Sequence, residues 1–492
     1  MNISEILDDY KYYGSIALDK IEFKRITYTK DKTDEECVFF HIRGVNYDTE
    51  ELNSEIVDKK PCAIVCDYES KISSEEIPIF YVKNARVALA WAYYKYYGID
   101  SESTRFVGVT GTNGKTTTAT MIKTALASEG RRVGFIGTGK IESDGHVISK
   151  FDYSMTTPDP DVLYSAIKRM QSDGCEYIVM ELSSHAIALG KLAPIFFELI
   201  VFTNLSHEHI DFHGNMESYY KTKLEIFKRT KLGIFNVDDY YVRRAYSECE
   251  CQRKSVGILR EADVLAKEPK MLGLDGSSYL YRDKDFIFRM NLPLPGAYNI
   301  YNSLCALCAS IALGCRPCVA KKALANMKAP DGRLQIIKGA DLTVIIDYAH
   351  TPFAFENVLK TISSAKNIEQ KLICVFGCGG LRDKNKRPLM AEAAERFSDF
   401  LVITEDNSRS ESRESIINEI MLGVTDKSKT AVIPSRQEAI ESAIFDASAG
   451  DIIAVLGKGA EKYNIDSTGT HPFDEKEIIE NALARRALVI EK

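Results

Sequence analysis

The sequence predicts an α/β protein built from three units. Two observations carry this prediction. The chain has 492 residues, enough for about three domains. Short apolar runs alternate with stretches of helical apolar spacing, which is typical of strands and helices in turn. We place the unit boundaries after residues 104 and 329, which gives units of residues 1–104, 105–329 and 330–492.

The sequence of the first unit predicts both strands and helices. Residues 60–68 (KPCAIVCDY) predict a strand, and the apolar spacing of residues 83–98 predicts a helix. Residues 101–105 are polar and predict a linker to the second unit.

The second unit begins with a strand at 105–111, a helix at 116–130 and a strand at 131–138. Residues 177–185 and 199–207 are further buried strands that end in polar residues. This alternation predicts a mostly parallel, doubly wound sheet with helices on its faces. Ligands of such sheets bind at the carboxyl ends of the strands.

The third unit repeats the pattern and predicts a second doubly wound α/β sheet. Its expected strands follow one another at regular spacing, with helical stretches between them. They are residues 342–348, 371–377, 399–406, 430–434 and 451–457.

Composition limits the classes of function. Apolar residues make up 45% and charged residues 27%, as in ordinary soluble globular proteins. The net charge of −7 argues against a general binder of nucleic acid or anionic membranes. The most apolar long window, residues 186–205, contains Lys191, Pro194 and Glu198 and is a poor bilayer span. The N-terminal residues lack an apolar signal core, so we expect a cytoplasmic protein with reduced thiols.

One cysteine pattern resembles a zinc motif. Cys305, Cys308, Cys315 and Cys318 spell C-x-x-C twice, but zinc ribbons separate the pairs by about 15–20 residues. The surrounding sequence is apolar at helical spacing, which favours small core residues over zinc ligands. Cys374 and Cys378, near a strand end, have the same interpretation.

The strongest local motif is VGVTGTNGKTTTATMI, residues 107–122. A strand leads into a glycine-rich turn, and Gly114, Lys115 and Thr116 open a helix. Such a helix N-terminus binds phosphate through unpaired N–H groups, with the lysine at the outer phosphates and the hydroxyl on Mg²⁺. The pattern G-x-x-x-x-G-K-[ST] is incomplete, because Val109 stands in place of its first glycine. The alternative is a plain glycine turn before a helix.

Two polar clusters follow later strands. Glu181 ends one strand, and HEHIDFHG at residues 207–214 follows another. Glu181 with one residue of the second cluster predicts a site for Mg²⁺ beside the phosphates. A histidine-rich zinc hydrolase site and a polar loop without metal remain open alternatives at this point.

These motifs, with four more, resemble the Mur ligase family of ATP-dependent amide-bond formers. The further segments are YYKTKLEIF, LPGAYNIYNSLCAL, DGRLQ and VIIDYAHTP, at residues 219–227, 294–307, 331–335 and 344–352. The resemblance implies a P-loop-type central domain, a Rossmann-like C-terminal domain and a smaller, divergent N-terminal domain for a UDP-linked substrate. It also implies ATP and two Mg²⁺ ions, with an acyl phosphate as intermediate.

Within the family, the C-terminal third is most similar to members that add the third residue of the peptidoglycan stem peptide. The strings are GCGGLRDKNKRPLM, TEDNSRSES and GKGAE, at residues 377–390, 404–412 and 457–461. This similarity implies UDP-N-acetylmuramoyl-L-alanyl-D-glutamate as acceptor. Asp406, Asn407 and Arg409 keep three residues of the D-N-P-R motif of members that use meso-diaminopimelate, and an arginine suits its extra carboxylate.

The resemblance implies a role for individual residues of this chain. Lys115, His209 and a carbamoylated Lys223 are the implied catalytic residues. The implied metal ligands are Thr116, Glu181, His209 and Lys223. The implied ATP contacts are Gly111, Thr112, Asn113, Gly114, Lys115, Thr116, Thr117, Asn299, Asn302, Arg333 and Asp347. Those to the acceptor are Thr156, Thr157, Ser183 and Lys191. Those to the amino acid are Arg382, Asp406, Asn407, Arg409, Gly457 and Glu461.

The chain also departs from the family pattern. The D-S-R motif of the N-terminal domain is absent from residues 29–44, Leu381 replaces an aspartate, and Ala460 replaces a histidine. Three hypotheses therefore stand: the stem-peptide ligase, a ligase of the same chemistry with another acceptor or amino acid such as L-lysine, and a non-catalytic nucleotide-binding module. We expect a monomer that acts on small-molecule substrates, with no nucleic-acid or membrane partner.

Overall fold

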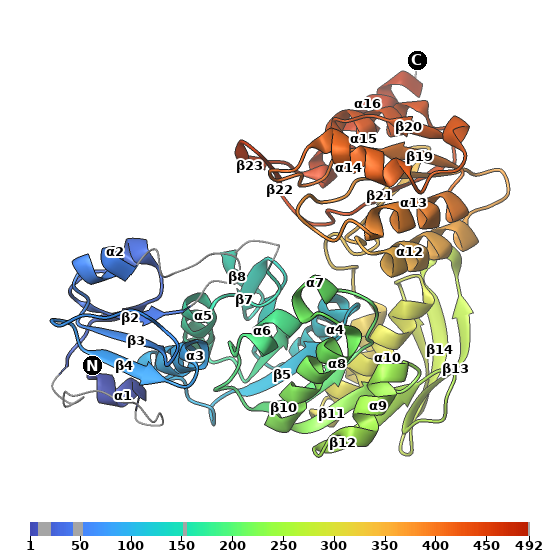
Figure 1. Cartoon of the computed structure of the whole chain (residues 1–492). Coiled ribbons are helices and arrows are strands. Elements are labelled where there is room, and N and C mark those ends of the chain that lie inside the picture. The colour runs from blue at the N-terminus through green and yellow to red at the C-terminus, as the bar shows by residue number, and fades with distance from the viewer. Residues whose placement is uncertain (8–20, 43–52, 151–154, 491–492) are drawn as a thin grey trace. The chain divides into compact units, whose positions relative to one another are not determined.

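The computed structural model describes residues 1–7, 21–42, 53–150 and 155–490 (Figure 1). These residues form an α/β fold, which confirms the predicted class. Contacts group the chain into two compact units, each described by itself. The first comprises Met1–Thr110, Arg131–Ile200 and Lys221–Leu232, and the second comprises Gly111–Gly130, Val201–Tyr220 and Gly233–Lys492.

A four-stranded parallel sheet forms near the N-terminus, in the order β1-β2-β3-β4. Phe39, Ile64 and Ile77 are among the buried residues of its core. The strands are β1 (Arg25–Thr27), β2 (Cys37–His41), β3 (Ala63–Asp67) and β4 (Ile79–Val82). The helices are α1 (Ile3–Leu7), α2 (Asn53–Asp58) and α3 (Ala85–Tyr96). The strand expected within 60–68 and the helix expected within 83–98 are confirmed as β3 and α3.

The large central sheet has the order β15-β14-β13-β12-β11-β10-β5-β9-β6-β7-β8. Strands β5, β9 and β6 pair in parallel, as predicted. The parallel strands are apolar along their length because both faces are covered. The bounds are β5 (Arg105–Thr110), β6 (Val133–Gly137), β7 (Lys140–Ser143), β8 (His146–Lys150), β9 (Tyr177–Glu181), β10 (Phe197–Phe202), β11 (Thr230–Asn236), β12 (Gln252–Gly257), β13 (Val264–Met271), β14 (Ser277–Arg282) and β15 (Ile287–Leu292).

Helices follow the strands of this sheet. They are α4 (Lys115–Ser128), α5 (Pro160–Ser172), α6 (Ser184–Ala188), α7 (Ile210–His213), α8 (Met216–Glu225), α9 (Tyr240–Glu248), α10 (Ala297–Ala312) and α11 (Pro317–Ala325). Short 3₁₀ turns in the chain are Lys30–Lys32, Ile226–Arg229, Gly273–Asp275 and Lys427–Lys429. Cys305, Cys308 and Cys315 are buried, as predicted for core residues, but Cys318 is exposed, so that prediction is wrong for Cys318.

The ends of the central sheet are antiparallel, which the sequence analysis did not foresee. Strands β13, β14 and β15 pair in antiparallel fashion at one edge, and β6, β7 and β8 do so at the other. Asp144 and Gly145 join β7 to β8, and both have positive φ. An Asp-Gly pair with positive φ at both positions is typical of a two-residue hairpin turn, so the signal was present in the sequence.

The C-terminal sheet has the order β16-β17-β21-β18-β19-β20 and is parallel apart from the edge strand β16. All five predicted strands are present. The bounds are β16 (Gln335–Lys338), β17 (Thr343–Asp347), β18 (Leu372–Phe376), β19 (Phe400–Ile403), β20 (Thr430–Val432) and β21 (Ile452–Leu456), with a separate hairpin of β22 (Tyr463–Asp466) and β23 (Gly469–Pro472).

Alternate side chains of this sheet enter two separate cores. Phe376 and Leu456 pack in the core that contains residues of α12 (Pro352–Ala365), α13 (Lys386–Phe397) and α14 (Arg413–Met421). Val375 and Val455 pack in the core with α15 (Arg436–Asp446) and α16 (Glu475–Ile490). Helices therefore cover both faces, which confirms the doubly wound pattern. Cys374 and Cys378 are buried core residues here.

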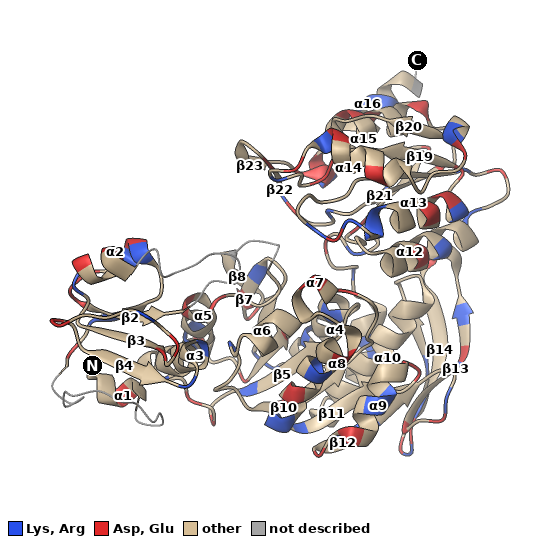
Figure 2. Ribbon diagram, viewed as in Figure 1, with Lys and Arg blue, Asp and Glu red and all other residues tan. Residues whose placement is uncertain are grey.

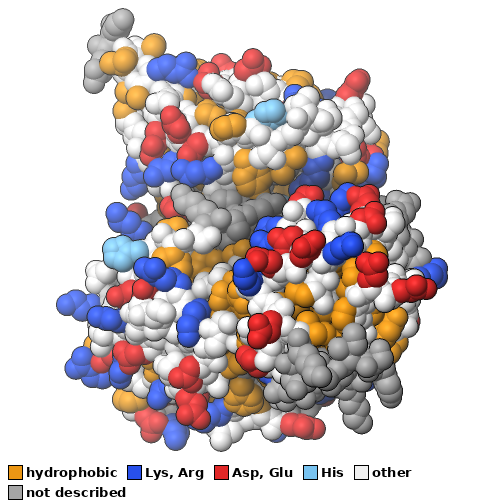
Figure 3. All heavy atoms as spheres, turned by 90° about the vertical axis from the view of Figure 1, so that its left-hand side faces the viewer, with side chains coloured by type: hydrophobic (Ala, Val, Ile, Leu, Met, Phe, Trp, Pro, Cys, Tyr) orange, Lys and Arg blue, Asp and Glu red, His pale blue; other side chains and the backbone are white. Residues whose placement is uncertain are grey.

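Acidic and basic residues are interspersed along the ribbon (Figure 2). The face drawn in Figure 3 likewise mixes both signs. Over the described residues, no helix is both long enough and apolar enough to cross a bilayer.

Candidate active site

The glycine-rich turn joins β5 to α4 and is held by the strand end that follows β10. The N–H of Thr112 donates to the carbonyl of Asn204 at 2.9 Å, and the N–H of Asn113 donates to the Asn204 side chain at 2.9 Å. The Thr203 hydroxyl donates to the Asn113 carbonyl at 2.7 Å. These bonds fix the loop in a defined shape before α4 begins.

Lys115 and Thr116 open α4, as the motif predicts. The Lys115 ammonium donates to the carbonyls of Gly111 and Thr112 at 3.1 and 2.8 Å, so it lies across the loop. Arg333 donates to the Thr116 hydroxyl at 3.3 Å, and its guanidinium lies over the ring of Tyr348. The structure thus brings Arg333 of the predicted ATP set to the phosphate loop.

Gly114 has the left-handed φ of 84° and leaves no room for a side chain. A Cβ atom there would collide with Oδ1 of Asn302. The Asn302 amide also accepts from Thr118 at 3.4 Å and donates to Asn299 at 3.0 Å, whose own amide donates to Pro295. Both asparagines of the predicted ATP set are therefore buried behind the loop.

We expect Gly114→Ala to weaken ATP binding by at least about tenfold, because the collision adds to the cost of a positive φ. Gly130→Ala is the matched control. Gly130 has φ of 87° but open space around its Cβ position. Calorimetric titration with ATP should show a loss for Gly114→Ala alone. Equal affinities of the two variants would contradict this role.

The polar loop after β10 places Glu208 beside His350. Their side-chain atoms Oε1 and Nε2 lie 3.4 Å apart. Burial raises the pKa of Glu208, but the hydrogen bond from His350 and the positive charge of His209 outweigh burial and bring the pKa below its usual range. His209 precedes α7 and has a left-handed φ of 55°. The loop therefore carries an ionised carboxylate next to the predicted metal ligand.

Glu181 ends β9 and is completely buried. The N–H of Thr138 donates to one carboxylate oxygen at 2.9 Å, and the Thr138 hydroxyl lies 3.4 Å from the other. The sequence analysis missed Thr138, although it follows the carboxyl end of β6, where the strand-end rule would have found it. A buried carboxylate is suited to bind a cation.

Three predicted acceptor residues lie close to the backbone of Glu181 or to Thr138. The Thr157 hydroxyl donates to the Glu181 carbonyl at 2.9 Å and lies 3.4 Å from the Ser183 hydroxyl. The Thr156 hydroxyl lies 3.5 Å from that of Thr138. The predicted Lys191 pairs with Asp159, two residues beyond Thr157, at 2.6 Å.

Lys223 is buried, with 1% of its surface exposed. Its ammonium donates to the Thr110 hydroxyl at 3.2 Å, and that hydroxyl donates to the Leu182 carbonyl, next to Glu181. A lysine in an amphipathic helix is ordinarily solvated, and the structure excludes that interpretation here.

Asp347 is a second buried carboxylate of the predicted ATP set. Its oxygens accept the N–H groups of Leu334 and Ala349, both at 2.7 Å. Burial raises its pKa. In this geometry Asp347 ties the segment that carries Arg333 to the end of β17.

The predicted amino-acid residues converge in the C-terminal α/β part. The Asn407 amide donates to Glu461 at 2.8 Å, and the N–H of Asn407 donates to Asp406 at 2.6 Å. Gly457 lies against them, since a Cβ there would be 2.9 Å from an Asp406 oxygen. Lys458 is wholly buried and donates to the Asn407 side chain at 2.9 Å. Sequence reasoning missed Lys458, although it lies within the quoted GKGAE string.

Two arginines lie at the edge of this network. Arg409 has a left-handed φ of 54° and donates to the carbonyls of Gly380 and Asn407 at 2.9 and 3.2 Å. Burial and the positive charge of Arg382 lower the pKa of Arg409. Two guanidinium groups that repel each other are stabilised when an anion binds between them.

The loop that carries Arg382 is anchored by a buried ion pair. Arg387 is fully buried and donates to Glu411 at 2.8 and 2.9 Å and to the Gly379 carbonyl at 3.1 Å. Its hydrogen bonds hold the pKa of Glu411 well below the usual range.

We expect Glu411→Gln to destabilise the protein by about 2 kcal/mol at neutral pH, because the buried Arg387 guanidinium loses its charge-assisted hydrogen bonds to Glu411 and keeps only Glu419, at 2.6 Å, as an ion-pair partner. The depressed pKa means that the wild-type ion pair stabilises the fold fully above the ordinary glutamate pKa of about 4.3 and loses this effect as the pH falls. Denaturant unfolding at several pH values should therefore show a difference that shrinks in acid. Glu392→Gln, at an exposed position of α13, should show none at any pH.

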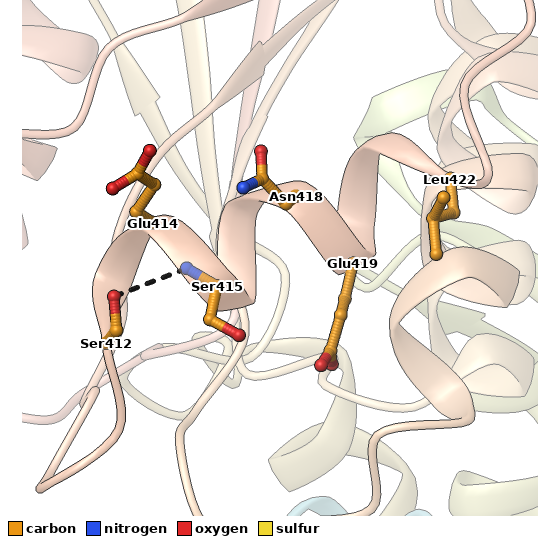
Figure 4. Close-up of a pocket in the computed structure, with 6 residues that line it drawn as sticks. All are labelled: Ser412, Glu414, Ser415, Asn418, Glu419 and Leu422. Carbon is orange, nitrogen blue, oxygen red and sulfur yellow. Dashed lines mark hydrogen bonds between the residues drawn. The ribbon is translucent and has the colours of Figure 1, made fainter.

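The described residues also form cavities outside this network. One of about 190 Å³ is lined by residues that include Arg25, Tyr28, Lys32, Tyr93 and Tyr97. Another, of about 430 Å³, runs along α14 and is lined by Ser412, Glu414, Ser415, Asn418, Glu419 and Leu422 (Figure 4). None of the predicted site residues lines the second cavity.

Family models match the chain in order. The Mur ligase middle domain matches residues 109–310, and the Mur ligase, glutamate ligase domain matches residues 332–459. A UDP-N-acetylmuramoyl-L-alanyl-D-glutamate--2,6-diaminopimelate ligase 1 from Clostridium acetobutylicum is 36% identical over 484 residues, which cover 97% of this chain and 98% of the relative. The chain belongs to the Mur ligase family. The predicted family and the predicted ligase class are confirmed.

Further relatives of this Mur ligase agree. A UDP-N-acetylmuramoyl-L-alanyl-D-glutamate--2,6-diaminopimelate ligase from Aquifex aeolicus is 34% identical, with 94% of this chain and 93% of the relative covered. A solved structure of a ligase with the same name has a TM-score of 0.68 at 26% identity and covers 99% of both chains. The MurF ligase of Thermotoga maritima, solved with ADP, has a TM-score of 0.61 at 19% identity over 95% of this chain and 99% of that one, and shows the shared fold.

Proposed function

We propose that this Mur ligase joins meso-diaminopimelate to UDP-N-acetylmuramoyl-L-alanyl-D-glutamate, with ATP as the energy source, in peptidoglycan precursor synthesis. The observation that carries the choice of amino acid is the cluster of Arg382 and Arg409 beside Asp406, Asn407 and Glu461. The names of the relatives support both substrates.

The cluster has the charges that a diamino dicarboxylic acid requires. An ammonium of the amino acid would share the buried acidic groups Asp406 and Glu461 with Lys458, whose ammonium lies 3.5 and 3.4 Å from them. Burial together with the charge of Asp406 raises the pKa of Glu461. The two guanidinium groups suit a carboxylate, which arginine binds in bidentate fashion. L-Lysine would supply no carboxylate at its far end, so the pair of arginines would lack a partner.

The phosphate loop supports the first half-reaction. The acceptor carboxylate attacks the γ-phosphate of ATP, expels ADP and forms an acyl phosphate. The incoming amine then attacks the acyl carbon, loses a proton and expels phosphate. We propose that Lys115, which donates to the Thr112 carbonyl of the loop, and Arg333, which donates to the Thr116 hydroxyl, neutralise phosphate charge. Phosphoryl transfer depends mainly on such positioning and charge.

The residues fit Mg²⁺ as the metal. The Thr116 hydroxyl and the fully buried Glu181 carboxylate are hard oxygen donors, and His209 is the third predicted ligand. Bound Mg²⁺ would supply positive charge at the phosphates. We propose two such sites and a carbamoylated Lys223 as an anionic ligand or support, because a buried ammonium near metal ions would be repelled, whereas a carbamate would be attracted.

We propose Thr156, Thr157, Ser183 and Lys191 as the acceptor-binding residues, since hydrogen bonds link the first three to the Glu181 backbone, to Thr138 or to one another. For the nucleotide end of the acceptor we propose residues 1–104. Arg25, Lys32 and tyrosine side chains of this part line the 190 Å³ cavity together with Asp161. We further propose domains at residues 1–104, 105–329 and 330–492, and we propose that the protein is a cytoplasmic monomer.

A panel of amino acids tests the assignment. Purified protein is incubated with ATP, Mg²⁺ and the UDP-linked dipeptide, and phosphate release is measured with meso-diaminopimelate, L-lysine and L-ornithine. Release with diaminopimelate alone is the expected result. Release with L-lysine instead would show that the carboxylate-binding role proposed for the arginine pair is wrong. Release with none of them would favour a different acceptor, a possibility that the absent D-S-R motif motivates.

A further inference from the structure

Arg436 is a buried arginine that the proposed ligation chemistry does not use. It is the first residue of α15, and 1% of its side chain is exposed. A buried guanidinium is costly unless hydrogen bonds and an opposite charge compensate for the lost water. The partners of Arg436 therefore indicate its role.

Each of the three guanidinium nitrogens has its own hydrogen-bond partner. Nη1 donates to the Glu405 carbonyl at 3.1 Å, and Nη2 donates to the Leu456 carbonyl at 2.8 Å. Nε donates to the carboxylate of Glu475, the first residue of α16, and forms an ion pair with it. The partners lie in three separate segments of the C-terminal α/β part, so Arg436 ties these segments together.

Two of these partners directly precede residues of the proposed amino-acid site. Glu405 precedes Asp406, and Leu456 ends β21 and precedes Gly457. The two loops follow β19 and β21, which β18 separates in the sheet, so no ladder of hydrogen bonds joins these two strands directly. Arg436 supplies a direct connection between the loops at the carboxyl ends of the strands, where ligands of such sheets bind.

The two loops are also close to each other at Arg436. Gly457 has a φ of 117°, and a Cβ atom there would lie 2.9 Å from an Asp406 carboxylate oxygen and 3.9 Å from Nη2 of Arg436. Burial raises the pKa of Asp406, but the charges of Lys458 and Arg436 and the hydrogen bond from the Asn407 N–H outweigh burial and lower the pKa. The guanidinium is therefore close enough to affect both the position and the charge of this carboxylate.

We propose that Arg436 is a positioning residue for the amino-acid site, whose guanidinium holds the loops after β19 and β21 at the spacing that the diamino acid requires. The inference rests on the proposed function, because it takes Asp406 and Gly457 as residues that bind the amino acid. Arginine suits this role because its planar group presents several N–H donors in fixed directions. A lysine has a single ammonium and could not reach all three partners in this geometry.

A similar arginine lies at the other end of the same two helices. Arg486 of α16 donates to the Asp341 carboxylate at 2.7 Å and to the carbonyl of Ile444, near the end of α15, at 2.6 Å. Asp341 precedes β17, so these contacts lie at the amino end of that strand, away from the proposed site. Arg486 is therefore a matched control for Arg436.

The main test replaces each ion pair with apolar side chains, an exchange that a buried pair can tolerate without loss of stability. Arg436→Met combined with Glu475→Leu should keep the midpoint of thermal unfolding but lose both carbonyl contacts. We expect the KM for meso-diaminopimelate to rise at least about tenfold, because the loops are no longer held in place, with the KM for ATP unchanged. Arg486→Met combined with Asp341→Leu should leave both KM values unchanged.

Two single variants separate positioning from stability. Glu475→Gln removes the charge beside the buried guanidinium and should lower the unfolding midpoint, but both carbonyl contacts remain, so the KM for diaminopimelate should stay near the wild-type value. Arg436→Lys keeps a positive charge for Glu475 but loses the fork that reaches both carbonyls, so this KM should rise severalfold. The KM should therefore follow the carbonyl contacts and not the unfolding midpoint.

The outcomes distinguish this inference from the proposed function. If the folded Arg436 variants kept the wild-type KM for diaminopimelate, or if the KM values for diaminopimelate and ATP rose together, the positioning role would be wrong. An equal rise in the Arg486 double variant would also overturn it. A wild-type protein that released no phosphate with diaminopimelate would instead contradict the proposed function, and the inference with it.

Discussion

Lys223→Ala is expected to lower the rate of ligation by at least about a hundredfold, because it removes the anion proposed to support the metal site. The side chain is buried and donates to Thr110, beside the strand end that carries Glu181. A short carboxylic acid added to the variant should restore part of the activity, since it can occupy the place of the carbamate. Steady-state phosphate release with and without acetate measures both effects.

Lys221→Ala is the matched control. Lys221 lies two residues earlier in the same helix and is exposed, so its loss should leave the rate unchanged. Thermal unfolding of both variants shows whether the buried change merely unfolds the protein. A fully active Lys223→Ala, or an inactive folded one that no carboxylic acid restores, would contradict the role proposed for this lysine.

Arg409→Lys is expected to raise the KM for meso-diaminopimelate by about 10–100-fold and to leave the KM for ATP unchanged. Lysine keeps the positive charge but loses the planar fork that binds a carboxylate in two places. The guanidinium also holds the carbonyls of Gly380 and Asn407, so part of the loss reflects a looser loop. Initial rates over a range of each substrate separate the two KM values.

Arg396→Lys tests whether any arginine change in this part of the chain has such an effect. Arg396 is largely exposed on α13 and pairs with Glu356 at the surface, and no change in either KM is expected. If Arg409→Lys raised both KM values equally, the residue would have a general structural role and would not select the amino acid.

Much of the fold could be predicted from the sequence because its parallel strands are buried on both faces. Such strands are continuous apolar runs, as in 371–377 and 451–457, and the structure has β18 and β21 there. The antiparallel edges were harder to predict. Strand β15 mixes exposed and buried positions without a clean alternation, so its sequence resembles a loop.

The candidate site, like the fold, could be predicted from the sequence only in part. Motif residues such as Lys115, Asn407 and Glu461 could be found because their strings are contiguous. The partners that hold them lie far away along the chain. Thr138 reaches Glu181 across 43 residues, and His350 meets Glu208 only through folding. Burial could not be foreseen either, since nothing in the letters around Lys223 distinguishes a buried lysine from a solvated one.

The proposed function is tested most directly by the product itself. Wild-type protein is incubated with ATP, Mg²⁺, the UDP-linked dipeptide and meso-diaminopimelate, and the nucleotide products are analysed by tandem mass spectrometry. The expected result is one new species in which diaminopimelate is joined by an amide to the glutamate, formed together with ADP and phosphate. An unchanged dipeptide, or a product that carries a different amino acid from a supplied mixture, would contradict the proposal.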